Sequence, residues 1–249
     1  YSNKILENNC HAELVSASQN LGNPNGYNPH PSPLPRRGNM FAFTLAEVLI
    51  TLVIIGVIAA ITVPTLINKA NNQEYVSKLK KAYSTLAQAT NQIIAKEGPV
   101  ITWTTSTDNI YNLYKKKLIN AKECGQNSGC MEQGYKYLRG NYEETSWDSN
   151  TSHRKFILTD GTQIMLGGSE LYDFSPDCSN NTFESNSCQS FFVDINGKSK
   201  PNTFGKDMFI FVLKKNGLYP AGCNTGICDK TQNGFACACK VLREGAINY

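Results

Sequence analysis

A long uncharged run dominates the hydrophobic pattern near the start of the chain. Twenty consecutive residues from Val48 to Ile67 carry no charge, and most of them are large and aliphatic. At about 1.5 Å per residue, a helix over this run is long enough to cross a hydrocarbon core of roughly 30 Å. The run therefore predicts a transmembrane helix. Pro64 lacks a backbone donor, so a kink or local melting is expected there.

Beyond Pro64 the apolar positions recur in steps of three and four, which is the period of an amphipathic helix. They are Tyr75, Leu79, Tyr83, Leu86, Thr90 and Ile93. Gly98-Pro99 ends the pattern. We therefore expect one helix over residues 43–97, about 80 Å long, with a transmembrane part at 43–67 and an amphipathic part at 68–97.

The rest of the chain shows the shorter periods of an antiparallel sheet. Two pairs of predicted strands flank turn sequences: residues 155–159 with 162–166, and residues 191–195 with 207–213. The first turn is Asp160-Gly161, and the second loop begins at Asn196-Gly197; both dipeptides favour tight turns. Four strands packed on the long helix predict an α+β domain over residues 98–249, which we call the head.

Three further segments of the head carry weaker signals. A cap at Thr107 or Asp108 predicts a short helix that ends at Ile119. A polar loop follows to about His153, which stands alone among polar residues and is expected at the surface. The last segment, residues 235–249, is predicted to be either an edge strand or a tail held by disulfides.

Residues 1–42 differ from the rest of the chain. Their second half is rich in Asn, Pro and Gly and shows no hydrophobic period. We interpret this segment as a leader, or partly as translated upstream sequence, that is absent from the mature protein.

One acid, Glu47, stands at the entrance of the apolar run. An ionised carboxylate costs about 2.5–3.5 kcal/mol at the centre of a membrane. We therefore expect Glu47 to have a function. The simpler alternative is that its side chain reaches the lipid headgroups as a surface residue.

The sequence Phe43-Thr44-Leu45-Ala46-Glu47 and the apolar helix after it resemble the N-terminus of type IV pilins and of the pseudopilins of type II secretion. Members of that family carry a small residue before Phe-Thr-Leu-x-Glu. The resemblance implies that a prepilin peptidase cuts between Ala42 and Phe43 and methylates the new amino group. Gly56 and Pro64 also lie where pilin helices commonly carry Gly and Pro.

The match departs from the family pattern at two points. Ala42 stands where Gly is usual, and the nearest basic residues, Arg36 and Arg37, lie several positions upstream of the cut. The resemblance is strong over residues 42–67, fair to about residue 97 and only generic beyond.

The resemblance implies a pilin-like fold and a non-enzymatic role as a filament subunit. In such a filament, the amine of a neighbouring Phe43 is the expected partner of Glu47. We favour a type II secretion pseudopilus over a type IV pilus for adhesion, motility or DNA uptake. The expected partners are other copies, related pilin-like subunits, the prepilin peptidase and an inner-membrane assembly platform with its ATPase. The protein would sit in the inner membrane as a single-pass precursor with its head outside the cytoplasm, and then in a periplasmic or extracellular filament.

Eight of the nine cysteines follow the apolar run, and an even number in an exported domain predicts disulfides. Cys124–Cys130 and Cys178–Cys188 are favoured because they close short loops. The pairing of the last four stays open: Cys223, Cys228, Cys237 and Cys239. A zinc cluster at these four is disfavoured, since zinc modules usually space paired ligands by two residues.

The loop between the last two predicted strands carries four oxygen-bearing side chains: Asp194, Asn196, Asn202 and Asp207. Such side chains suit calcium, and pseudopilins of the major class are known as a family for a calcium site. However, the EF-hand spacing is incomplete and three lysines in the loop oppose a cation. Turn chemistry by Asn, Gly and Pro is the simpler interpretation, and calcium is the alternative; no other cofactor is expected.

Charge and motifs narrow the remaining function classes. The formal net charge is only +4 and no basic stripe stands out, so nucleic acid is not an expected partner. The sequence has no nucleotide-binding or hydrolase motif. Two other readings remain. Leu45–Ala60 would be an ordinary secretory signal, giving a soluble disulfide-bonded binding protein. Alternatively, the helix would be a permanent anchor whose head never polymerises.

Overall fold

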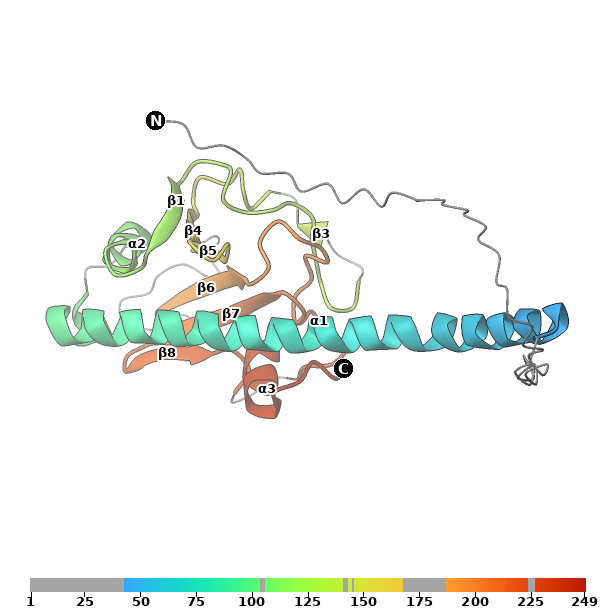
Figure 1. The fold of residues 1–249 in the computed structure, drawn as a ribbon. Coiled ribbons are helices and arrows are strands. Elements are labelled where there is room, and N and C mark those ends of the chain that lie inside the picture. Colours follow the sequence, from blue (N-terminus) through green and yellow to red (C-terminus); the bar gives the residue numbers. More distant parts are fainter. Residues whose placement is uncertain (1–42, 104–105, 141–142, 145, 168–186, 224–226) are drawn as a thin grey trace, which may run out of the picture. The chain divides into compact units, whose positions relative to one another are not determined.

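The computed structural model describes residues 43–103, 106–140, 143–144, 146–167, 187–223 and 227–249 (Figure 1). The predicted leader, Ala42 and Cys178 lie outside these ranges. The chain divides into two units, residues 1–52 and 53–249. The described helices are α1 (Leu45–Glu97), the short 3₁₀ helix η1 (Val100–Thr102), α2 (Thr107–Lys115) and α3 (Cys237–Glu244).

Helix α1 confirms the long helix that the apolar pattern predicted. It contains Gly56 and Pro64, and the residues on both sides of each are helical. The melting expected at Pro64 is therefore not seen. The helix ends at Glu97 because Gly98 takes the left-handed conformation (φ 86°) and Pro99 follows it.

The amphipathic half of α1 packs on the head through one stripe. Its buried residues are Val76, Leu79, Ala82, Leu86, Ala89, Thr90 and Ile93. The larger members were predicted from their spacing, except Val76. Tyr75 and Tyr83 are half-buried at the margins of the stripe. The alanines were not predicted; their small side chains let the helix approach the sheet closely.

Six strands form one antiparallel sheet in the order β1-β4-β5-β6-β7-β8. They are β1 (Asn120–Gly125), β4 (Arg154–Leu158), β5 (Gln163–Leu166), β6 (Gln189–Asp194), β7 (Met208–Lys214) and β8 (Gly217–Pro220). A separate pair joins β2 (Tyr135–Lys136) to β3 (Glu143–Glu144). The long helix and this sheet give the α+β architecture that was predicted.

Both predicted hairpins are confirmed: β4 pairs with β5, and β6 pairs with β7. Strands β1 and β8 and the small β2–β3 pair were not predicted from the sequence. These strands are short or irregular, and β1 pairs with β4 through two register shifts. Such strands have no clear alternation of apolar and polar residues to reveal them.

Helix α2 corrects the predicted boundaries. The cap is Ser106, whose side chain accepts a hydrogen bond from the Asn109 backbone N–H at 3.2 Å, and the helix ends at Lys115 rather than Ile119. Asp108, a predicted alternative cap, instead pairs with Arg154.

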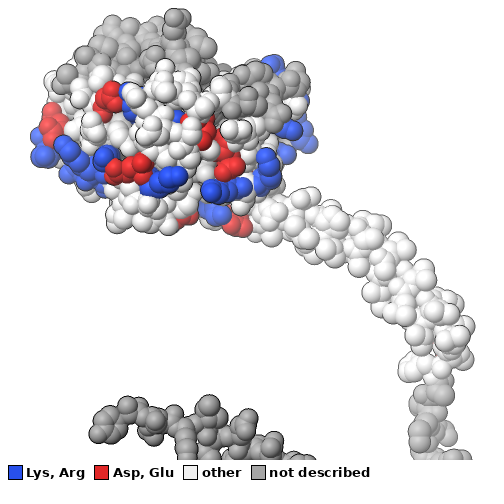
Figure 2. All heavy atoms as spheres, turned by 90° about the horizontal axis from the view of Figure 1, so that it is seen from above, with Lys and Arg blue, Asp and Glu red and all other residues white. Residues whose placement is uncertain are grey.

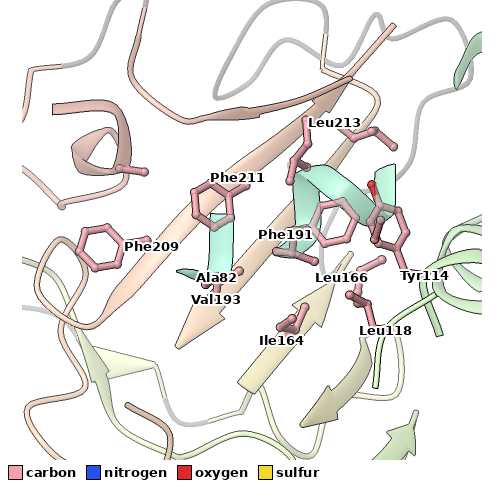
Figure 3. Close-up of a cluster of buried hydrophobic side chains, with 14 of the residues drawn as sticks. Ala82, Tyr114, Leu118, Ile164, Leu166, Phe191, Val193, Phe209, Phe211 and Leu213 are labelled. Carbon is pink, nitrogen blue, oxygen red and sulfur yellow. The ribbon is translucent and has the colours of Figure 1, made fainter. Parts of the chain in front are cut away.

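Both faces of the sheet are covered, which explains the continuous apolar runs in β6 and β7. Alternate residues such as Phe191, Phe211 and Leu213 face the cluster that contains the buried stripe of α1 (Figure 3). The intervening Phe192, Ile210 and Val212 belong to a second cluster with Tyr135, Phe204 and Phe235. The head therefore has two cores, one on each side of its sheet.

The structure decides two predictions for the rest of the head. His153 is buried rather than exposed, and its Nδ1 lies 3.1 Å from the carbonyl oxygen of Trp147. The C-terminal segment is a tail held by disulfides, as one of the two alternatives proposed, but it also contains α3. Cys228–Cys237 and Cys223–Cys239 form a nested pair around the start of this helix.

Candidate functional site

The first turn of α1 is closed by a reciprocal contact between Thr44 and Glu47. The Thr44 backbone N–H and hydroxyl donate to Glu47 Oε2 at 2.8 Å and 2.9 Å, and the Glu47 N–H donates to the Thr44 hydroxyl at 3.2 Å. This is a capping box, in which both side chains satisfy N–H groups that the helix start leaves unpaired. The signal Thr-x-x-Glu is present in the sequence, but Glu47 was predicted either to pair with a neighbouring subunit or to reach the lipid headgroups, and not to cap its own helix.

Of the predicted processing and assembly residues, Phe43 and Glu47 lie within the described residues. Phe43 is 81% exposed and directly precedes the capping box. A chain that began at Phe43 would place its amino group beside the first turn of α1. The arrangement thus leaves Phe43 accessible while Glu47 is held by its own helix.

The first half of α1 presents a long and mostly apolar surface. Its exposed large residues are Leu45, Val48, Leu49, Ile50, Leu52, Val53, Ile54, Ile55, Val57, Ile58, Ile61, Val63, Leu66 and Ile67. On the face shown in Figure 2 this segment is white, whereas the head carries both acidic and basic side chains. By length and composition, α1 is the one helix among the described residues able to cross a membrane. An exposed apolar surface of this extent indicates contact with lipid or with another protein.

A second candidate site lies where β6 ends and β7 begins. Asp194 and Asp207 are both fully buried. Asp194 Oδ1 accepts from the N–H groups of Asn196 and Gly197 at 3.1 Å and 2.8 Å. Asp207 accepts from the N–H groups of Asn202 and Thr203 at 2.7 Å and 2.6 Å. Both carboxylates therefore organise the loop between the two strands, as turn chemistry predicted.

The two carboxylates also lie close enough to repel each other. Burial and the neighbouring Asp207 charge raise the pKa of Asp194 to about 8. Burial also raises the pKa of Asp207. Tyr135, which the sequence analysis did not single out, donates its hydroxyl to Asp194 Oδ2 at 2.8 Å. No sequence signal links Tyr135 to this loop, because the two segments meet only in the folded chain.

The structure brings all four predicted calcium ligands to this loop. The side-chain oxygens of Asn196 and Asn202 are buried and accept no hydrogen bond. Carboxylate and amide oxygens are ligand types that calcium takes, and calcium at this loop stays a prediction. No group of three His, Cys, Asp or Glu side chains suited to a metal occurs in the described part of the chain.

The cysteines of the described residues are held in disulfides. Cys124–Cys130 is bonded as predicted. The pairing that the sequence left open is Cys223–Cys239 and Cys228–Cys237. Cys178 lies outside the described residues, and so the predicted Cys178–Cys188 pair does too. Because the last four cysteines are oxidised, they are not available as thiolate ligands for zinc.

A family model described as a family of unknown function (DUF6613) matches residues 65–235. This range covers the amphipathic half of α1 and most of the head. No curated protein matches the chain, and no solved structure matches it.

Proposed function

The chain belongs to the DUF6613 family of unknown function, and we propose that it is a structural subunit of a type II secretion pseudopilus. The observation that carries the proposal is the division of α1 into two surfaces. The segment before residue 68 exposes its large apolar side chains, whereas the segment from Val76 to Ile93 buries one stripe of side chains against the head. One helix thus joins a folded domain to an apolar surface whose exposure to water is unfavourable.

Two environments can cover that surface. A lipid bilayer matches its length and lack of charge, and the same helices from other copies match its aliphatic side chains. A subunit that is first anchored in lipid and then transferred into a bundle of helices uses both in turn. Head-to-tail contacts of this kind are heterologous and build an open helical filament rather than a closed ring.

Glu47 would act at the transfer step. In a bundle of apolar helices an unpaired carboxylate is costly, so a positive charge near it is favoured. We propose that a cut before Phe43 supplies that charge as the methylated amino group of a neighbouring subunit. This contact would fix how far each subunit is staggered along the next. The energy for extraction from the bilayer would come from an assembly platform with its ATPase.

The rival reading as a soluble secreted protein is less well supported. A signal peptidase cut near Ala59 or Ala60 would leave a new N-terminus followed by several exposed aliphatic residues: Ile61, Val63, Leu66 and Ile67. A soluble protein would expose these residues to water without compensation. In a filament, these residues would pack against the helices of neighbouring subunits.

The test replaces Glu47 by alanine in cells that make the protein. Carbonate extraction should show Glu47→Ala in the membrane fraction at the wild-type level. The amount recovered in sheared filaments should fall several-fold, because the charge that aligns subunits is gone. Filament recovery at the wild-type level would refute the proposed role.

Deletion of the gene separates the two filament types. Loss of an exported enzyme from the medium is the outcome expected for a secretion pseudopilus. Loss of long surface fibres with normal export would instead assign the protein to a type IV pilus.

A further inference from the structure

A groove lies between α1 and the C-terminal segment, just beyond the apolar run. One wall is the backbone of residues 245–247, and the other is a face of α1 formed by Thr65, Asn68, Lys69, Asn72, Gln73 and Val76. Asn72 Nδ2 donates to the Ile247 carbonyl at 3.2 Å, which ties the C-terminal segment to α1 (Figure 1). The groove has a volume of about 440 Å³, within the range of about 300–1,000 Å³ that is usual for small-ligand sites.

The helix face in the groove continues the buried stripe of α1 but changes its chemistry. The buried residues of the stripe begin at Val76. At the same steps of three and four before it stand Asn72, Lys69 and Thr65, which are all polar. A stripe that only packed on the C-terminal segment would be apolar like the rest of the stripe. The polar face therefore indicates a polar occupant.

The groove also lies at a defined distance from the apolar run. Residues 48–67 fill a hydrocarbon core of roughly 30 Å, and the headgroup layer on each side adds about 5–7 Å. The helix rises about 7.5 Å from Asn68 to Gln73. When the apolar run spans a bilayer, the groove therefore opens in the headgroup layer of the leaflet on the side of the head.

The charge of the groove favours an anion. Lys69 is the one charged residue among those that line it, and within the ranges that the structure describes it forms no ion pair. The acids next to the two walls already have partners: Glu74 pairs with Lys78 at 2.8 Å, and Glu244 pairs with Arg243 at 3.8 Å. Phosphate oxygens accept strong hydrogen bonds from a lysine ammonium.

We propose that this groove binds the headgroup of one anionic phospholipid, with Lys69 and Asn68 donating to its phosphate oxygens. An acyl chain of the same lipid would run along the face of α1 that carries Ile61 and Ile58. Both residues are exposed, and they precede Thr65 by steps of four and three. The inference rests on the membrane-anchored stage of the proposed function and does not depend on filament assembly.

A lipid fits the groove better than free phosphate does. Its acyl chains hold the phosphate at the membrane surface, so the effective concentration beside Lys69 is high. Free phosphate lacks this advantage and leaves Ile58 and Ile61 without a ligand. A zwitterionic lipid offers the same phosphate but carries its own cation, which competes with Lys69. An anionic headgroup is therefore the occupant that matches both the charge and the position.

The experiment counts lipids bound to the full chain in dodecyl maltoside by native mass spectrometry. Phosphatidylglycerol and phosphatidylcholine with the same acyl chains are titrated at equal concentrations. One phosphatidylglycerol per chain should bind about fivefold more tightly than phosphatidylcholine, because one lysine contributes about that much near an anionic surface. Sodium phosphate in large excess should not displace it.

Variants at exposed positions of α1 test the position of the charge. Lys69→Gln should weaken the binding of phosphatidylglycerol about fivefold. The double variant Lys69→Asn with Asn71→Lys keeps the net charge and the depth but moves the lysine to a residue that does not line the groove. It should weaken binding as much as Lys69→Gln. Lys198→Gln, at an exposed position of the head, should bind as the wild type does.

Four results would overturn the proposal. They are equal binding of the two lipids, displacement by free phosphate, wild-type affinity in the double variant, and a dimer of the chain whose formation expels the lipid. The last would assign the groove to a second copy. A chain that binds phosphatidylglycerol as expected but forms no filaments would refute the pseudopilus alone. A chain that forms filaments but fails the lipid titration would refute this site alone.

Discussion

Glu47 Oε2 accepts hydrogen bonds from both the backbone N–H and the hydroxyl of Thr44, at 2.8 Å and 2.9 Å. The carboxylate therefore has a role within its own helix, whatever it does in an assembly. A loss of filaments on removing Glu47 has two explanations: a lost charge or a frayed helix start. The chain offers substitutions that distinguish them.

Glu47→Gln tests the charge alone. Glutamine serves in a capping box as glutamate does, so the helix start should be kept. Glu47→Gln should reduce sheared filaments about as much as Glu47→Ala, with normal membrane insertion. Filament yield is measured by immunoblot of the sheared fraction against total cell protein.

Thr44→Ala is the matched control. It removes the cap at a cost of about 1 kcal/mol of helix stability but leaves the charge of Glu47 in place. Filament yield should stay near the wild-type level. If Thr44→Ala abolishes filaments while Glu47→Gln assembles normally, the acid acts only as a helix cap and the intersubunit pairing is wrong.

Leu79 tests the docking of α1 on the head. It is fully buried in the core cluster, so Leu79→Ala should lower the free energy of unfolding by about 2–5 kcal/mol. Ser84→Ala, at an exposed position of the same helix, should change it by less than about 0.5 kcal/mol. Urea unfolding of the detergent-solubilised chain measures both. Equal stability of the two variants would mean that this half of α1 does not pack as described.

The nested disulfides give a direct chemical prediction. Non-reducing peptide mapping should recover Cys223 linked to Cys239 and Cys228 linked to Cys237. Replacing Cys228 and Cys237 together by alanine should lower the free energy of unfolding by about 2–4 kcal/mol, since the unfolded chain becomes less restricted. Recovery of Cys223 linked to Cys228 would contradict the described C-terminal fold.

Asp108 and Arg154 predict a dependence on acid. Arg154 donates to both carboxylate oxygens, and this hydrogen bonding lowers the pKa of Asp108. A lowered folded-state pKa contributes stability that is complete above the unfolded value of about 3.9 and is lost as pH falls through the folded value. Because Asp108 is 57% exposed, the contribution is at most about 1 kcal/mol.

Thermal midpoints measured from pH 7 down to about 2 check this prediction. Asp108→Asn should lower the midpoint at pH 7 and leave it less sensitive to acid below pH 4 than the wild type. A variant whose acid sensitivity equals that of the wild type would show that the pair adds no stability.

The parts of the fold that sequence could predict are those with strong local signals. The apolar run and the steps of three and four from Leu79 through Tyr83, Leu86 and Thr90 to Ile93 were enough for α1. Asp160-Gly161 was enough for the β4–β5 hairpin, since the turn itself favours pairing. Strand β8 was missed because its four residues include Gly217 and Pro220, which are poor strand formers.

The parts that sequence could not predict depend on contacts between distant segments. His153 stands in a polar stretch, yet its ring lies at the edge of Trp147 and is buried by tertiary packing. The four oxygen-bearing residues of the loop between β6 and β7 could be recognised in the sequence. The burial of Asp194 and Asp207 and the role of Tyr135 could not. Burial decides whether such a loop is a solvated turn or a site, and no local pattern reports it.

A cut before Phe43 is the step that would convert an anchored precursor into a filament subunit, and mass spectrometry of the mature N-terminus detects that cut. The protein isolated from its own cells should begin at Phe43 and carry a methyl group on that amine. A mature chain that begins near Thr62, or one that retains the segment before Phe43, would contradict it.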